Sequence, residues 1–172
     1  MVLLESVMER ETLTAAEQGT SKPRRICFVC TGNTCRSPMA EAVANAIIAS
    51  KEQTEPCVCS RGLFAHDGDR ISALAVQALE EAEIPTVKGC DYHMHVAQAL
   101  RADEVGSYDL IVAMTDAHAM QLMMRFPEVA ERIVVIKGSI PDPFGGDLAV
   151  YRECLSRICD GVRTLLASEE LL

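Results

Sequence analysis

The chain has 172 residues, of which 49% are hydrophobic and 24% charged, and its formal net charge is −9. This length fits one domain with a substantial core, and the acidic balance excludes wholesale binding to nucleic acid. The eight cysteines are not spaced as a disulfide framework, and no apolar run is long enough to span a membrane. We therefore expect a cytoplasmic protein that has no membrane partner.

The first 23 residues stand apart from the rest of the chain. Apolar positions between residues 2 and 8 are followed by a polar stretch from Gln18 to Pro23. We expect residues 1–23 to form an extension that is either disordered or a short docking helix. The folded domain is expected to span residues 24–172.

Strand patterns alternate with helix patterns through the remainder of the chain. Apolar runs predict buried strands at 26–29, 57–59, 108–114 and 133–136. Helical spacing predicts helices at 37–50, 72–83, 96–105, 115–127 and 148–165, with Ser37 capping the first and Pro38 at its first position. Such alternation predicts an α/β three-layer sandwich around a central parallel sheet of about four strands, of the flavodoxin-like type.

Residues 29–39 join the first predicted strand to the first helix and read VCTGNTCRSPM. A strand, a short polar loop and a helix start together form a ring of backbone N–H groups that can hold an oxyanion. Cys30 lies at the base of this ring, where a helix N-terminus and a neighbouring arginine favour a reactive thiolate. Arg36 closes the ring, and its planar fork matches two phosphate oxygens. The loop therefore predicts a nucleophile beneath an anion site.

Three small or polar residues are expected to shape this loop. Gly32 would let the backbone aim its N–H groups inward, and Asn33 tolerates left-handed geometry and can brace the loop. Ser37 can donate a hydrogen bond to the sulfur of Cys30 and would stabilise that sulfur as a leaving group.

Phosphoryl transfer also needs an acid, which should come from another loop at the same edge of the sheet. Asp142 lies between two prolines in the segment 140–146, which reads IPDPFGG. It would protonate the leaving atom in the first step and activate water in the second. Phe144 is expected to form one wall of the substrate slot.

Residues 29–41, with Cys30, Arg36 and Ser37 in place, resemble the signature of the low-molecular-weight protein tyrosine phosphatases, and Asp142-Pro143-Phe144 resembles their acid motif. The resemblance extends from Ile26 to the C-terminus. It implies a phosphocysteine intermediate, phosphorylated proteins as substrates, and neither a cofactor nor a metal, with a monomer favoured. The implied substrate-binding residues are Thr31, Gly32, Asn33, Thr34, Cys35, Ser37 and Phe144, with Ser60 in support.

One position narrows the resemblance to the bacterial protein arginine phosphatases. Thr34 stands where tyrosine phosphatases of this class usually carry isoleucine, and the segments 31–34 and 142–146 fit the arginine-specific branch. A smaller, partly polar wall suits a slim guanidinium better than a phenyl ring, and Asp142 can pair with that guanidinium. The alternative is a phosphotyrosine-specific enzyme in which threonine is a tolerated variant.

Two departures and one addition accompany the resemblance. Arg61 stands where the family has a small residue, which weakens the expected support of Asn33 by Ser60. Lys88 falls where the family often has a histidine, and His93 is the nearest replacement. Cys35 matches a second cysteine that family members are thought to use in a reversible disulfide with the nucleophile, the alternative being a buried structural thiol.

The remaining features yield weaker expectations. An arsenate reductase-type redox enzyme would need a relay of further thiols, for which only Cys90 is suitably placed, and a catalytically idle phospho-residue binder would not need an intact acid. A loose Cys90, His93 and His95 cluster is more typical of an exposed loop than of a metal site. His118 is expected to be solvated. Core packing is expected of three methionines, Met120, Met123 and Met124.

Overall fold

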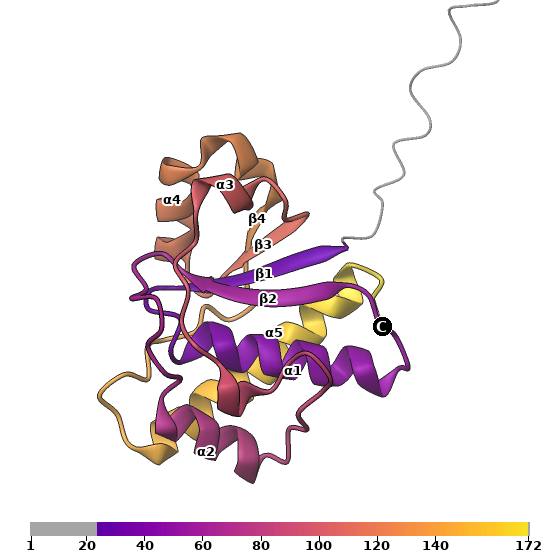
Figure 1. Cartoon of the computed structure of the whole chain (residues 1–172), viewed down its shortest axis with the longest axis vertical. Helices are drawn as coiled ribbons and strands as arrows, with labels where there is room; N and C mark the ends of the chain where they lie inside the picture. Colours follow the sequence, from indigo (N-terminus) through magenta and orange to yellow (C-terminus); the bar gives the residue numbers. More distant parts are fainter. Residues whose placement is uncertain (1–23, 172) are drawn as a thin grey trace, which may run out of the picture.

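The computed structural model describes residues 24–171, and the expected extension at 1–23 lies outside them. Four parallel strands form one sheet in the order β2-β1-β3-β4 (Figure 1). The strands are β1 (Arg25–Cys30), β2 (Cys57–Gly62), β3 (Leu110–Ala113) and β4 (Ile133–Val135). The predicted central parallel sheet of about four strands is therefore confirmed.

Helices cover both faces of this sheet and complete the three predicted layers (Figure 1). One face carries α1 (Arg36–Ser50) and α5 (Leu148–Ser168), with α2 (Ala73–Glu81) packed against α5. The short elements η1 (Tyr92–Met94), α3 (Ala102–Val105), α4 (Asp116–Arg125) and η2 (Pro127–Arg132) complete the described fold. Between residues 24 and 171, no helix has the length and apolar character needed to cross a bilayer.

Strand β1 is apolar on both faces because it lies in the middle of the three layers. Ile26 and Phe28 pack into the layer of α1 and α5, whereas Cys27 and Val29 pack toward α3 and α4. All four side chains are fully buried. Alternation of successive side chains across a strand explains why this run shows no polar positions.

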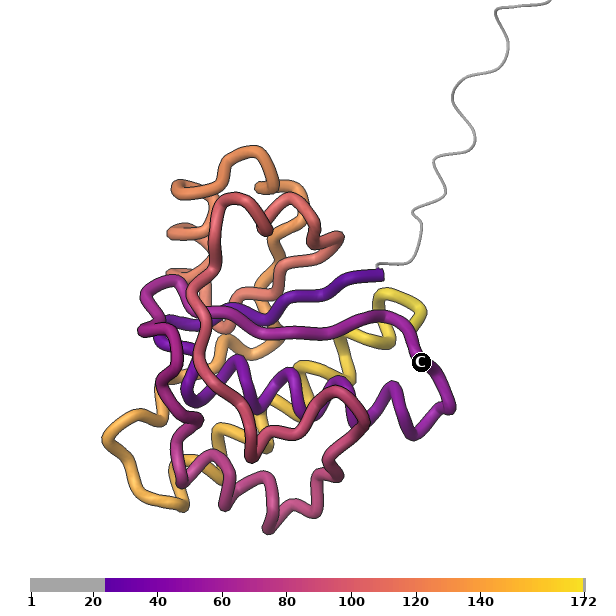
Figure 2. The backbone as a smooth tube through the Cα atoms, viewed as in Figure 1, coloured from indigo at the N-terminus to yellow at the C-terminus, as the bar shows by residue number. Residues whose placement is uncertain are grey.

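The carboxyl ends of the strands bring distant loops to one edge of the sheet. The backbone N–H of Met114, just after β3, donates to the carbonyl of Val29, and the N–H of Ile140 donates to the carbonyl of Met114. Figure 2 shows the chain beyond β4 passing along this edge before it enters α5. The segment that holds Asp142 is thereby tied to the end of β1.

Two local predictions were wrong. The segment 96–105 is helical only from Ala102, because Val96 and Ala99 form isolated bridges to Arg70 and Gly62. Helix α1 begins at Arg36, and its N-cap residue, Cys35, makes no side-chain capping bond. Ser37 therefore lies inside the first turn, which leaves its hydroxyl available for the loop.

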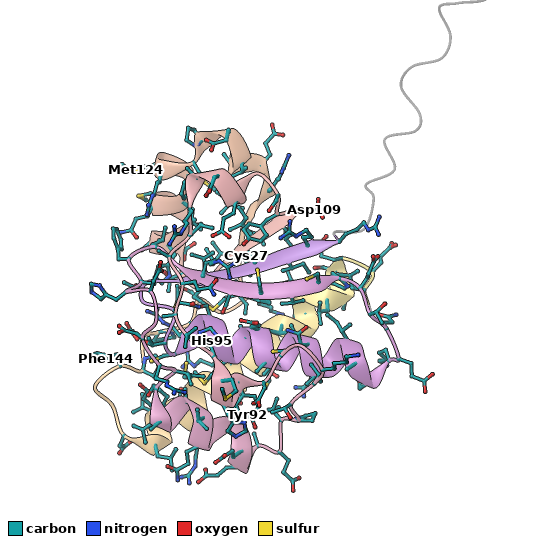
Figure 3. All side chains as sticks on the ribbon, in the orientation of Figure 1. Cys27, Tyr92, His95, Asp109, Met124 and Phe144 are labelled. Carbon is teal, nitrogen blue, oxygen red and sulfur yellow. The ribbon has the colours of Figure 1, made fainter. Side chains whose placement is uncertain are left out.

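The three methionines of α4 are also placed differently from expectation. Met120 is 64% exposed, Met123 41% and Met124 78%, so the helix turns this side to solvent. Figure 3 shows Met124 pointing outward from the layer of α4. Only His118, Ala119 and Leu122 are buried on this helix.

Candidate active site

Cys30 is the last residue of β1, and its side chain is almost fully buried. Its Sγ lies 3.0 Å from the Oγ of Ser37 in the first turn of α1. The Ser37 Oγ accepts a hydrogen bond from Asn33 Nδ2 at 2.9 Å and lies 3.3 Å from the carbonyl oxygen of Arg61. The one hydroxyl proton of Ser37 has two acceptors within reach, the Cys30 sulfur at 3.0 Å and the carbonyl oxygen of Arg61 at 3.3 Å, and the sulfur is the nearer of the two.

Asn33 holds the loop from behind. It is fully buried with a φ of 56°, the left-handed conformation that asparagine tolerates. Its Nδ2 donates to Ser60 Oγ at 2.9 Å, and its Oδ1 accepts from the backbone N–H of Gln98 at 2.9 Å. The left-handed turn of the loop is thus made by Asn33, whereas Gly32 has no positive φ.

The presence of Arg61 does not disturb the contact between Asn33 and Ser60. Its guanidinium turns away from the loop and pairs with the carboxylate of Glu104, at 3.1 Å from Nε to Oε1. Arg61, the residue that departs from the family pattern, therefore lies on the side of β2 away from the loop. The hydrogen bond from Asn33 to Ser60 is present and is not weakened as the sequence predicted.

Of the two histidines that closely follow Lys88, His95 contacts the loop and His93 does not. His95 Nε2 lies 3.0 Å from the carbonyl oxygen of Asn33, whereas His93 bonds to Glu80 and Asp91 at the surface. Figure 3 shows His95 beside α1.

Glu41 completes this network and was missed from the sequence. Its Oε2 accepts a hydrogen bond from Ser60 Oγ at 2.5 Å and lies 4.0 Å from His95 Nδ1. Burial raises the pKa of Glu41, although the bond from Ser60 and the charge of His95 oppose this shift. The only signal in the sequence was a carboxylate on the expected first helix, which is too common to single out.

Arg36 and Asp142 meet above the loop. The Arg36 guanidinium is buried, and its Nη2 lies 2.8 Å from Asp142 Oδ2, while Nη1 donates to the carbonyl of Ile140 at 3.3 Å. Within residues 24–171, the Nε of Arg36 is a buried donor without a hydrogen-bond partner. An unpaired buried donor on a cation is costly unless an anion can bind it. This part of the loop can therefore receive an oxyanion.

The residues expected to touch the substrate differ in exposure, and Asn33 and Cys35 are among those that are buried. Thr31 is exposed, Thr34 is half-buried, and Phe144 is 79% exposed on the loop before α5. The backbone N–H of Phe144 donates to Asp142 Oδ1 at 3.2 Å, which orients the carboxylate. Figure 3 shows Phe144 at the outer rim of the molecule.

Cys35 is buried beneath the loop and contacts a tyrosine that the sequence did not single out. Its Sγ lies 3.3 Å from the hydroxyl of Tyr151 on α5, and that hydroxyl accepts from Ser72 Oγ at 3.2 Å. Burial and the contact with Cys35 raise the pKa of Tyr151 to about 12.

His118 is buried and not solvated, contrary to expectation, with only 5% of its surface exposed. Its Nε2 lies 2.9 Å from Thr31 Oγ1, and its Nδ1 lies 2.8 Å from Thr115 Oγ1. Burial and the charge of Arg36 lower the pKa of His118 to about 4, so the ring is neutral near pH 7.

The arrangement suits displacement at a tetrahedral anion. A buried sulfur with a hydroxyl donor lies below the loop, and a cationic donor with a neighbouring carboxylate lies above it. These are the parts that covalent catalysis with electrostatic stabilisation requires. Across the described residues, no group of three or more His, Cys, Asp and Glu side chains is arranged to hold a metal ion.

Known proteins share this sequence and fold. The family model described as low molecular weight phosphotyrosine protein phosphatase matches residues 25–171. A protein-arginine-phosphatase of Bacillus subtilis is 35% identical over 147 residues, which cover 81% of this chain and 93% of that protein. The low molecular weight protein-tyrosine-phosphatase PtpB of Staphylococcus haemolyticus is 36% identical over 140 residues, which cover 78% and 91%.

A solved structure adds a chemical detail. It is a YwlE arginine phosphatase, a cysteine-to-serine mutant with a phosphorylated active-site serine. This chain matches it with a TM-score of 0.74 at 32% identity, over 85% of this chain and 95% of that one.

Proposed function

Because the chain belongs to the low molecular weight phosphotyrosine protein phosphatase family, we propose that it hydrolyses phosphorylated arginine side chains of proteins through a phosphocysteine intermediate. Protein phosphatase activity follows from the family and from its relatives, which are protein-arginine and protein-tyrosine phosphatases. We further propose the roles of individual residues and a preference for phosphoarginine.

The first step transfers the phosphoryl group to Cys30. The thiolate Sγ attacks phosphorus while the bond from phosphorus to the guanidinium nitrogen breaks, and Asp142 donates a proton to that nitrogen. Arg36 Nε and the backbone N–H groups of the loop bind the phosphoryl oxygens. The phosphorylated active-site serine of the mutant relative supports a covalent intermediate at this position.

The second step releases phosphate. Asp142, now ionised, takes a proton from water as the water oxygen attacks phosphorus, and the bond from phosphorus to Sγ breaks. The departing thiolate is stabilised by the hydroxyl of Ser37, whose oxygen lies 3.0 Å from the sulfur. Cys30 is thereby regenerated for the next substrate.

Thr34 is the observation that carries the preference for arginine. It is half-buried in the loop between Asn33 and Cys35, and its Oγ1 lies 3.7 Å from the Sγ of Cys35. Threonine offers less apolar contact surface than isoleucine, which weakens packing against a phenyl ring. A planar guanidinium can still approach the short, hydroxyl-bearing side chain. We expect the carboxyl group of Asp142 to hydrogen-bond to the substrate guanidinium as well.

The test compares two peptides of one sequence that carry either phosphoarginine or phosphotyrosine. The wild type should show the higher kcat/KM on phosphoarginine, and Thr34→Ile should shift the ratio toward phosphotyrosine by about tenfold or more. Thr86→Ile, at an exposed threonine away from the loop, is the matched control and should leave the ratio unchanged. Preference of the wild type for phosphotyrosine, with no effect of Thr34→Ile, would refute the arginine assignment.

Phosphotyrosine is the second candidate substrate, since the relative with 36% identity is described as a protein-tyrosine-phosphatase. The same pair of peptides decides between the two.

All eight cysteines lie in the described residues and are free thiols. Free thiols in this number favour a reducing compartment, so we place the enzyme in the cytoplasm.

A further inference from the structure

His118 is a buried imidazole with a threonine hydroxyl at each ring nitrogen. Thr31, at 2.9 Å from Nε2, directly follows the nucleophile, and Thr115, at 2.8 Å from Nδ1, is the N-cap of α4. Thr31 and His118 are 87 residues apart in the sequence, so the contact exists only in the folded chain. Neither hydroxyl contact is used in the phosphoryl-transfer steps above.

The tautomer of His118 sets the direction of these hydrogen bonds. Thr115 Oγ1 accepts from the backbone N–H of His118 at 3.2 Å, and its nearest described acceptor is Nδ1 of the same residue. If Thr115 donates to Nδ1, a neutral ring carries its proton on Nε2 and donates it to Thr31 Oγ1. In this series of hydrogen bonds from Thr115 through His118 to Thr31, every proton then has a partner except the hydroxyl proton of Thr31.

This arrangement leaves the exposed hydroxyl of Thr31 with two free functions in hydrogen bonding, one as a donor and one as an acceptor. A hydroxyl has one proton and two lone pairs, and His118 occupies one lone pair. The other lone pair and the proton remain free at the mouth of the loop. Thr31 directly follows Cys30 and its side chain is exposed, so this hydroxyl lies at the surface beside the nucleophile.

We propose that His118 is a positioning residue that fixes the Thr31 hydroxyl in the substrate slot, where it accepts a hydrogen bond from the substrate guanidinium. This inference rests on the proposed arginine phosphatase function. Phosphoarginine offers a partner for both free functions of Thr31, an N–H for the lone pair and a phosphoryl oxygen for the proton. The ring of phosphotyrosine offers no donor, so the lone pair would be desolvated without a partner.

A neutral His118 is essential to this role. A doubly protonated ring would place a second cation beside Arg36 and opposite the incoming guanidinium. Burial and the Arg36 charge hold the pKa of His118 at about 4, so the ring stays neutral while the enzyme works near pH 7.

The experiment measures kcat and KM separately for phosphoarginine and phosphotyrosine peptides of one sequence. Thr31→Val keeps the shape of the side chain without its hydroxyl, and His118→Phe keeps a buried ring without its nitrogens. Each should lower kcat/KM on phosphoarginine by about tenfold and on phosphotyrosine by at most about threefold. The double variant should lose no more than either single variant, because His118 acts through Thr31.

Two further variants separate positioning from a structural role. His118→Gln retains an N–H donor for Thr31 and should recover most of the arginine activity. Thr86→Val is the matched control at an exposed threonine and should leave both substrates unaffected. Ring nitrogen NMR shifts of His118 should show a neutral ring protonated on Nε2 at pH 7.

The outcomes distinguish this inference from the function on which it rests. A wild type that turns over phosphotyrosine but no phosphoarginine refutes both. An arginine-active wild type whose variants lose equally on both substrates, whose double variant shows additive losses, or whose His118 ring is doubly protonated at pH 7, refutes only the role of His118.

Discussion

The carboxylate of Asp142 lies 2.8 Å from Nη2 of Arg36, the side chain that is expected to bind the substrate phosphate. An incoming phosphoryl group and this carboxylate therefore compete for one cation. Arg36 is buried, whereas about half of the Asp142 side chain is exposed, so Asp142 is the partner that can move. Binding of phosphate would release the carboxylate toward the leaving atom.

Asp142→Asn tests this relationship. The substitution removes both the acid and the competing negative charge, so turnover should fall by about a hundredfold or more while inorganic phosphate binds more tightly. Steady-state kinetics and the inhibition constant of phosphate measure the two effects. Asp147→Asn is a matched control, because Asp147 only caps α5 through Val150 and asparagine caps equally well. Weaker phosphate binding by Asp142→Asn would contradict the competition.

Ser37→Ala removes the hydroxyl that lies 3.0 Å from Cys30 Sγ. The thiolate leaving group of the second step loses a hydrogen bond, so hydrolysis of the phosphocysteine should slow by about tenfold or more. Rapid-quench measurements should then show a burst of the first product and accumulation of the phosphoenzyme. Ser72→Ala, which removes a hydroxyl that donates to Tyr151, should show no such burst. Equal slowing of both steps would argue against this role.

Gly62 lies where β2 passes closest to the loop. A Cβ there would lie 2.7 Å from Ala65 Cβ and 2.8 Å from the carbonyl oxygen of Thr31, and the latter is backbone that cannot turn away. Gly62→Ala should therefore destabilise the fold by about 2 kcal/mol and lower kcat/KM by displacing the loop. Urea denaturation and peptide assays measure both.

Gly106→Ala is the matched control for this clash, since a Cβ at Gly106 meets no atom within 4 Å. It should leave activity intact and stability unchanged or slightly higher. Full activity of Gly62→Ala at wild-type stability would show that the loop tolerates the displacement.

The depressed pKa of His118 makes stability depend on pH. The unfolded chain binds a proton at this histidine below about pH 6.5, whereas the folded chain does so only near pH 4. The contribution of His118 to the free energy of unfolding should therefore fall by about 3 kcal/mol as the pH drops between these values, and stay level below them.

His118→Gln cannot titrate and should lack this decrease. Urea denaturation across the interval gives the difference between wild type and variant, which cancels the effects of other groups such as Glu41. His118→Phe should show the same difference in slope. Parallel pH profiles of wild type and both variants would contradict the burial of a neutral ring.

The sequence predicted the layers well because their signals are local. The apolar run of β1 and the stripe along α5 each reflect burial of neighbouring residues, and the observed sheet has the expected strands. Cys30, Arg36 and Asp142 could be singled out because their chemistry is uncommon in such loops.

Contacts between distant residues could not be predicted in the same way. The contact of His118 with Thr31 leaves no signal in the residues near His118, so burial of this ring could not be predicted. The contact of His95 with Asn33 likewise joins residues 62 positions apart, which is why the sequence favoured His93 in its place. The helix expected from residue 96 gave way to bridges with other segments for the same reason. Tertiary partners override local propensity wherever they satisfy backbone groups.

The buried Asn33 ties the catalytic loop to β2 and to the segment before α3 through Ser60, His95 and Gln98. Opening the loop alone would break all of these bonds at once, so the loop cannot form an independently unfolding unit. Catalytic competence and global folding then disappear in a single cooperative event.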